Sequence, residues 1–203
     1  MRGDDVFICT NLGTIANVSA HTGAIRWLRR YPRGRIERDR RRGRSLRNVP
    51  AWQHNPVLLD GHRVVCMPID ALDLIVLDVR SGNVLYTKPI ESPGVAVSLI
   101  GSRDGAVYTV GESITRHDTD AGTVAWSNAL GSDSPVSGRA TWAGSNLLVP
   151  TKTHLVVCGM EGGEVSALSW RRDGGSGNVV AMPDSILVAE AGSISAYQSK
   201  SAI

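Results

Sequence analysis

The chain has 203 residues, of which 42% are hydrophobic and 20% charged, a composition of globular rather than disordered proteins. It has no run of eighteen apolar residues, so the sequence predicts no membrane-spanning helix. The net charge of +3 is uneven: residues 26–47 hold eleven of the 22 basic residues and only two acidic ones, which leaves the remainder at −6. A mildly acidic body argues against a nucleic-acid-binding protein outside that segment.

A β-type unit repeats five times along the chain. Each copy has an alternating apolar strand, a polar turn that often ends in Gly, and a strand that often ends in an aromatic residue. The residue four before the turn Gly marks each copy, and these markers are Ser19, Asp78, Asp118, Gly159 and Gln198. Successive markers lie 59, 40, 41 and 39 residues apart. A period near 40 built only from strands is typical of a β-propeller blade, and the first step contains about twenty inserted residues.

The strands follow in chain order. The first unit begins at residues 5–8, which already resemble a second strand. The next unit is complete, and its four strands are predicted at residues 55–59, 63–67, 73–78 and 83–86. Full blades follow at 95–126 and 139–167, and the last unit ends with its third strand at 193–197. We therefore predict an all-β fold, a partial β-propeller of four-stranded antiparallel blades, with three full blades and two truncated ones in one arc over residues 1–203.

The two end units contain strands two to four and strands one to three, so each duplicates the middle of the other and cannot share one blade. We interpret the chain as a fragment of a larger propeller; the alternative is an open arc that a partner or dimerisation completes. The uncharged last strand, residues 193–197, is then an exposed edge that favours self-association. The start, MRGDDVFICT, has no apolar signal core, so the protein is cytoplasmic or its true N-terminus is missing.

The units resemble the pyrroloquinoline-quinone-like propeller repeat, most closely in V-L-D-V-R-S-G-N-V-L-Y (residues 76–86) and R-H-D-T-D-A-G-T-V-A-W (residues 116–126). The resemblance implies that aromatic residues at the outer strand dock one blade on the next, with turn glycines that let the ring approach. The predicted blade-docking residues are Trp27, Tyr86, Trp126, Gly23, Gly82 and Gly122. It also implies a periplasmic or cell-envelope location.

The family includes quinone-dependent dehydrogenases, and the resemblance implies that one such group uses adjacent cysteines and a Ca²⁺ site. This chain has no Cys-Cys pair, and we predict no cofactor, no metal and no catalytic residue. Cys9, Cys66 and Cys158 are interpreted as small buried hydrophobic residues. Asp70 and Asp73 are expected in a solvated loop rather than at a metal, and the five histidines are expected to be structural or on the surface.

The arginine-rich segment, residues 32–52, is the part that the repeat does not explain. Blocks of like charge are usually solvated insertions. The segment could instead contact RNA, anionic lipid or an acidic partner, through Arg38, Arg40, Arg41, Arg42 and Arg44.

Three functions follow from the sequence. The favoured hypothesis is a non-catalytic scaffold that mediates protein interaction, whose partners include a protein and the remaining blades of a longer parent chain. The alternative is part of a quinone-dependent dehydrogenase whose active-site blades lie outside this fragment. The third is a polyanion binder that acts through the arginine-rich segment.

Overall fold

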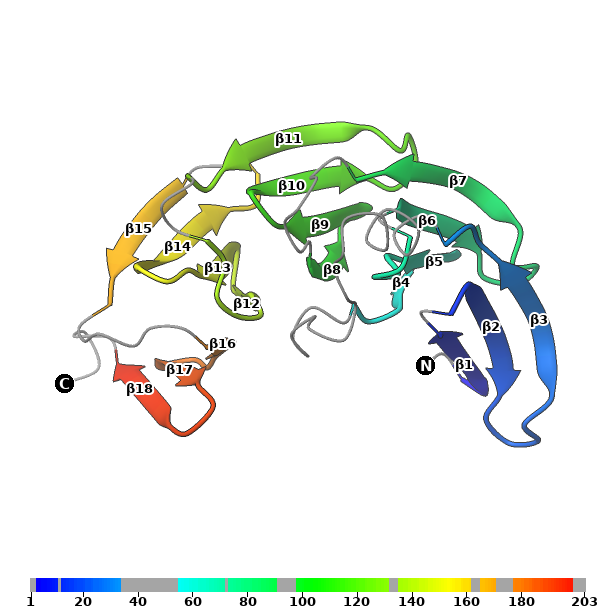
Figure 1. The fold of residues 1–203 in the computed structure, drawn as a ribbon, viewed down its shortest axis with the longest axis horizontal. Coiled ribbons are helices and arrows are strands. Elements are labelled where there is room, and N and C mark those ends of the chain that lie inside the picture. Colours follow the sequence, from blue (N-terminus) through cyan, green and yellow to red (C-terminus); the bar gives the residue numbers. More distant parts are fainter. Residues whose placement is uncertain are drawn as a thin grey trace, which may run out of the picture. The chain divides into compact units, whose positions relative to one another are not determined.

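The structure, a computed structural model, describes residues 3–10, 12–33, 55–71, 73–90, 98–131, 135–161, 165–170 and 177–198. Within these residues the regular elements are eighteen β-strands, arranged in five antiparallel sheets that follow one another along the chain (Figure 1). No helix in this part of the chain is long and apolar enough to cross a membrane.

The first sheet has three strands, in the order β1 (Asp5–Cys9), β2 (Thr14–Ser19) and β3 (Ile25–Arg30). The second sheet has four, β4 (Leu58–Asp60), β5 (Arg63–Cys66), β6 (Asp73–Asp78) and β7 (Val84–Pro89). Its first strand begins three residues later than predicted, because β4 pairs with β5 only through Leu58, Leu59 and Asp60. Its last strand is longer than predicted, because pairing with β6 continues to Pro89.

The third and fourth sheets also have four strands each. They are β8 (Ser98–Arg103), β9 (Ala106–Val110), β10 (Ser113–Asp118) and β11 (Val124–Ala129), then β12 (Thr141–Ala143), β13 (Asn146–Pro150), β14 (His154–Gly159) and β15 (Val165–Ser169). The fifth sheet has three strands, β16 (Asn178–Ala181), β17 (Ser185–Ala189) and β18 (Ile194–Gln198). Three four-stranded and two three-stranded sheets confirm the predicted blades.

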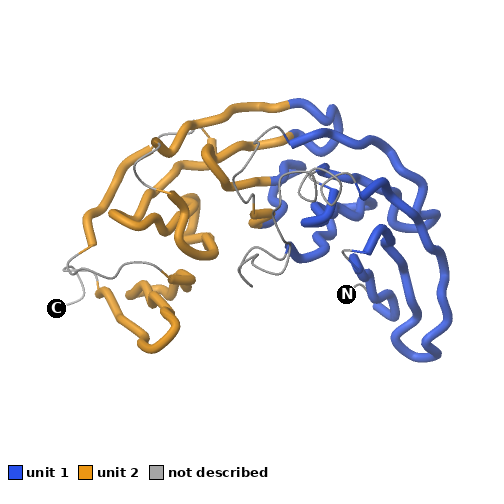
Figure 2. Tube along the Cα trace, in the orientation of Figure 1, with its two compact units in different colours: residues 1–93, 101–107, 118–123 blue, residues 94–100, 108–117, 124–203 orange. Residues whose placement is uncertain are grey.

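The chain divides into two compact units, which Figure 2 distinguishes by colour. Unit 1 contains residues 1–93, 101–107 and 118–123, and unit 2 contains residues 94–100, 108–117 and 124–203. The organisation of the chain as a single arc stays a prediction.

Each unit has its own apolar core between successive sheets. In unit 1, Ile15 of the first sheet packs with residues of the second sheet, including Val64, Cys66, Ile75 and Leu77. In unit 2, one cluster is built around Val110, Ile114, Leu147, Val149 and Val156, and another joins the fourth and fifth sheets through Leu148, Leu155, Val179 and Val188. In the second sheet, β5 and β6 are buried on both faces, as is typical of strands that lie between two packed layers.

Candidate functional site

The turn between the third and fourth strands of a blade is held by a carboxylate. Asp78 Oδ1 accepts hydrogen bonds from the backbone N–H groups of Arg80 (3.1 Å) and Ser81 (2.8 Å), and from the Ser81 hydroxyl (2.8 Å). In the third sheet, Asp118 accepts the two equivalent backbone bonds at 2.8 Å each. The bonds from Ser81 hold the pKa of Asp78 below its usual value, because they favour the ionised carboxylate.

The first sheet has Ser19 in place of the turn aspartate, and the carboxylate of Asp4 takes over its role. The Ser19 hydroxyl donates to Asp4 Oδ2 (2.7 Å), and the His21 backbone N–H donates to Asp4 Oδ1 (2.8 Å). These bonds, the one from Ser19 first, lower the pKa of Asp4. Sequence reasoning missed Asp4, because antiparallel pairing of Asp5 with Ser19 is what brings it to the turn.

An aromatic ring of the first sheet lies against a turn of the second. Trp27 is half-buried, and its Nε1 donates to the carbonyl of Val79 (3.1 Å). A Cβ atom at Gly82 would lie 2.5 Å from Cδ2 of this ring, so the contact requires Gly there. Two residues after the aromatic, Arg29 Nε donates to the carbonyl of Gly82 (2.8 Å).

The same contact recurs one blade later. The Tyr86 ring covers Gly122, where a Cβ atom would lie 3.2 Å from Cε2 of the ring. The Tyr86 hydroxyl lies 3.3 Å from the carbonyl oxygen of Thr119, and Lys88 Nζ donates to the carbonyl of Gly122 (3.1 Å). An aromatic residue followed two positions later by a basic one therefore forms both contacts. We name this the docking pair: Trp27 with Arg29, and Tyr86 with Lys88.

The other predicted docking residues lie in different surroundings. Trp126 is half-buried in the cluster of the third and fourth sheets, beside Tyr108, with ring centroids 6.1 Å apart. Its Nε1 is buried and has no hydrogen-bond partner within the described residues. Gly23 has a φ of +72°, like Gly82 and Gly122, but a Cβ atom there would meet no described atom within 4 Å. The energetic role of these six residues in docking stays a prediction.

Polar side chains also join the second sheet to the turn between β10 and β11 of the third sheet. Arg63 forms an ion pair with Asp120, and the hydroxyl of Thr119 donates to Asp60 Oδ2 (2.7 Å). In the first sheet, Asp5 occupies the position that Arg63 has in the second. Asp5 pairs with Ser19, and Arg63 pairs with the equivalent residue Asp78.

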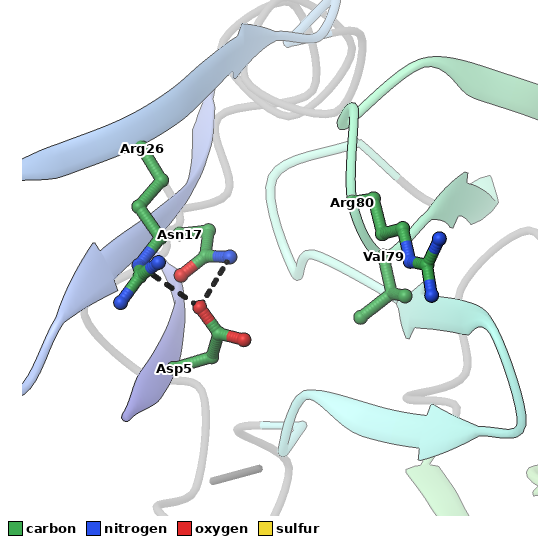
Figure 3. A pocket seen from close by; sticks show the side chains of 5 residues that line it. All are labelled: Asp5, Asn17, Arg26, Val79 and Arg80. Carbon is green, nitrogen blue, oxygen red and sulfur yellow. Dashed lines mark hydrogen bonds and ion pairs between the residues drawn. The ribbon is translucent and has the colours of Figure 1, made fainter. Parts of the chain in front are cut away.

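A pocket of about 380 Å³ lies in unit 1, and its lining residues are Asp5, Asn17, Arg26, Val79 and Arg80 (Figure 3). Asp5 Oδ1 accepts hydrogen bonds from Asn17 Nδ2 (3.0 Å) and Arg26 Nε (3.1 Å), whereas the Arg80 side chain extends away from Asp5. Among the described lining residues, no Ser, Thr or Cys lies beside a base.

The expectation of a solvated Asp70 is wrong. The Asp70 side chain is fully buried. It accepts a hydrogen bond from the Tyr31 hydroxyl (2.8 Å) and forms an ion pair with Arg33 Nε (2.8 Å). Burial first, and then this bond, raise the pKa of Tyr31. Tyr31 lies just before the arginine-rich segment and Arg33 lies at its start, so a sequence pattern confined to the loop could not reveal them.

The remaining predicted sites are only partly described. Among the described residues, no group of three or more His, Cys, Asp or Glu side chains comes together as a metal site. The absence of a cofactor stays a prediction. The five predicted polyanion contacts lie outside the described residues, and they are Arg38, Arg40, Arg41, Arg42 and Arg44. Cys66 and Cys158 are buried, and Cys9 is partly buried.

Comparison with solved structures identifies the fold. BamB from Moraxella catarrhalis matches 97% of this chain with a TM-score of 0.69 and 19% identity, and the chain covers 58% of it. The extracellular domain of BT4673 from B. thetaiotaomicron gives 98% coverage, a TM-score of 0.69 and 15% identity, with 26% of that chain covered. Quinohemoprotein alcohol dehydrogenase from Comamonas testosteroni matches 92% of this chain with a TM-score of 0.65 and 11% identity, and the chain covers 38% of it. At these identities the similarity shows the fold alone, that of a β-propeller.

The sequence comparisons are narrower. No curated protein matches significantly. A family model described as outer membrane protein assembly factor BamB matches residues 11–176, which include the strands from β2 to β15 and the docking pairs. The resemblance to pyrroloquinoline-quinone-like repeats is thereby confirmed, and the chain belongs to the family of the outer membrane protein assembly factor BamB.

Proposed function

We propose that this chain is a non-catalytic β-propeller scaffold of the cell envelope that binds other proteins. The family description, an outer membrane protein assembly factor, supports both the location and the role. A fold by itself does not imply a function, so the proposal also needs a surface of this chain on which another protein could bind.

One observation carries the proposal. The face of the second sheet that packs against the first sheet has an equivalent face on the first sheet itself. The second sheet receives the first on Val64, Cys66, Ile75 and Leu77, against a face that includes Ile15. On the first sheet, strand register makes Val6, Ile8, Ala16 and Val18 the equivalents of these four residues. Beside them the Gly23 turn is open, whereas the equivalent turns at Gly82 and Gly122 are each covered by an aromatic ring.

This face is apolar and partly accessible: Ala16 at its centre is buried, and Val6 and Val18 are partly exposed. Ile8, Ala16 and Leu28 lie directly opposite one another on β1, β2 and β3, and Ile8 and Leu28 are 42% and 51% exposed. Contiguous apolar surface of this kind marks interaction sites. We name it the receiving face: Val6, Ile8, Ala16, Val18, Gly23 and Leu28.

The proposed occupant is a blade of the same repeat type, on another protein or in a longer parent chain. Its outer strand carries an aromatic residue followed two positions later by Arg or Lys, because both described docking pairs have this form. The ring would cover Gly23, and the basic side chain would donate to the Gly23 carbonyl. The two docking pairs of this chain thus define which side chains the partner blade must carry.

A cyclised hairpin peptide of residues 14–31 is a suitable probe, because it displays Ile15 and the docking pair Trp27 and Arg29 on one face. We expect it to bind the full chain and to shift the amide resonance of Gly23, while a Trp27→Ala hairpin does not. Ile8→Glu in the full chain should abolish binding. Ile194→Glu, at a strand position 74% exposed in the fifth sheet, is the matched control and should bind normally. Equal binding to both variants, or none to the unaltered chain, would refute the proposal.

An enzymatic alternative is kept because the fold is shared with quinohemoprotein alcohol dehydrogenase. In that alternative the chain contributes blades to a quinone-dependent dehydrogenase. Dye-linked oxidation of alcohol or glucose, after incubation with pyrroloquinoline quinone and Ca²⁺, separates the two functions, since a scaffold gives no activity above background.

A polyanion-binding role for residues 32–52 is a further candidate, which the run of arginines favours. It predicts retention on immobilised heparin that moderate salt abolishes.

A further inference from the structure

Two of the three cysteines come together in the core of unit 1. Cys9 is the last residue of β1 in the first sheet, and Cys66 is the last residue of β5 in the second. Cys66 is fully buried in the cluster between these sheets, and the partly buried Cys9 packs against that cluster. A hydrogen bond with the Cys9 side chain is the first cause of the raised pKa of Cys66, with burial second. The two thiol groups therefore lie within hydrogen-bonding reach of each other.

We propose that Cys9 and Cys66 form a disulfide that joins the first sheet to the second when the protein meets a disulfide oxidant. The two side chains come from successive sheets, pack in one core cluster and share a hydrogen bond, so the chain needs only a local adjustment to reach bonding distance. Cys158 is the internal comparison, since it is buried in a cluster of unit 2 that contains no other cysteine among its described members.

The reaction is a thiol–disulfide exchange. Cys9 attacks first as the thiolate, because it is partly exposed while Cys66 is fully buried. Its sulfur bonds to one sulfur of the oxidant, a small disulfide such as oxidised glutathione or the disulfide of an oxidoreductase, and the other sulfur leaves as a thiol. The Cys66 thiolate then attacks the Cys9 sulfur and releases the second thiol. Two protons leave the cysteines, and two electrons reduce the oxidant.

The bond would have a structural consequence for this chain. It would enclose residues 10–65, and so the whole arginine-rich segment, in one covalent loop. A first sheet with three strands would then be fixed to the second by a covalent bond as well as by the Trp27 contact. Disulfides persist in oxidising compartments such as the bacterial periplasm.

The test uses the purified full chain with oxidised glutathione, followed by thiol titration in denaturant. We expect the titratable thiols to fall from three to one, and the intact mass to fall by two hydrogen atoms. Non-reducing peptide mapping should recover a linked peptide that contains Cys9 and Cys66. The melting temperature should rise by about 10 °C for a loop of this length, and a reductant should reverse the rise.

Cys158→Ser is the matched control and should still lose two thiols, whereas Cys9→Ser should form no internal disulfide. Three remaining thiols, a stable glutathione adduct on Cys9 alone, or a linked peptide that contains Cys158 would each overturn the proposal. Peptide mapping of the unaltered chain decides the question even where a serine variant fails to fold. A yield that rises with protein concentration would show bonding between molecules and would also refute it.

Discussion

Substitution of the turn glycines by alanine offers a graded test of how the blades dock. Gly23, Gly82 and Gly122 share a left-handed backbone, with φ of +72°, +66° and +66°. Alanine at each position therefore carries the same backbone strain, roughly 1 kcal/mol. The three positions differ only in what the new methyl group meets, so Gly23→Ala is the natural control for the other two.

The contacts set the order of the three effects. At Gly82 the methyl group would lie 2.5 Å from the Trp27 ring, which must move away, and overpacking adds about 1–3 kcal/mol to the strain. At Gly122 the nearest atom of Tyr86 is 3.2 Å away, so a small shift of the ring suffices. We expect losses of about 1 kcal/mol for Gly23→Ala, about 1–2 for Gly122→Ala and about 2–4 for Gly82→Ala.

Urea unfolding at constant m-value measures these losses. A double-mutant cycle isolates the contact: in a Trp27→Ala background, Gly82→Ala should cost no more than Gly23→Ala, because the ring is gone. Equal losses for Gly82→Ala and Gly23→Ala in the unaltered chain would refute the docking argument. So would a Gly82→Ala loss that the Trp27→Ala background leaves unchanged.

Four further predictions follow from the structure. Trp126→Ala should lower the free energy of unfolding by about 3 kcal/mol, measured in urea, and a loss below about 0.5 kcal/mol would exclude a packing role. The lowered pKa of Asp78 stabilises the fold above the ordinary carboxyl value of 3.8, and this stability is lost as the pH falls through the lowered pKa; Asp78→Asn should reduce that acid sensitivity in pH-dependent unfolding. Calorimetry with pyrroloquinoline quinone and Ca²⁺ should show no binding, and stoichiometric binding would contradict the scaffold proposal. Deletion of residues 33–47 should remove heparin retention, and unchanged retention would place polyanion binding elsewhere.

The fold was accessible from the sequence because the repeat is local. Each blade is a meander of neighbouring strands, so alternation of apolar residues and the recurring turn fix its strands without distant contacts. The turn glycines and the aromatic residues were found for the same reason, since they recur at a fixed position in each copy. Errors in the strand ends, as at β4 and β7, arose where pairing rather than composition sets the boundary.

The candidate site depended on contacts between paired strands and between sheets, which no local pattern contains. Asp4 reaches the Ser19 turn through strand pairing, and the buried Asp70 meets Tyr31 and Arg33, which follow the end of β3. The open turn at Gly23 resembles its two covered copies in sequence, and only packing distinguishes them. Sequence by itself determined the blades and their order, because each strand pairs with its neighbour along the chain. The tertiary structure alone decided which thiols, carboxylates and rings meet, because those contacts form when separate sheets pack face to face.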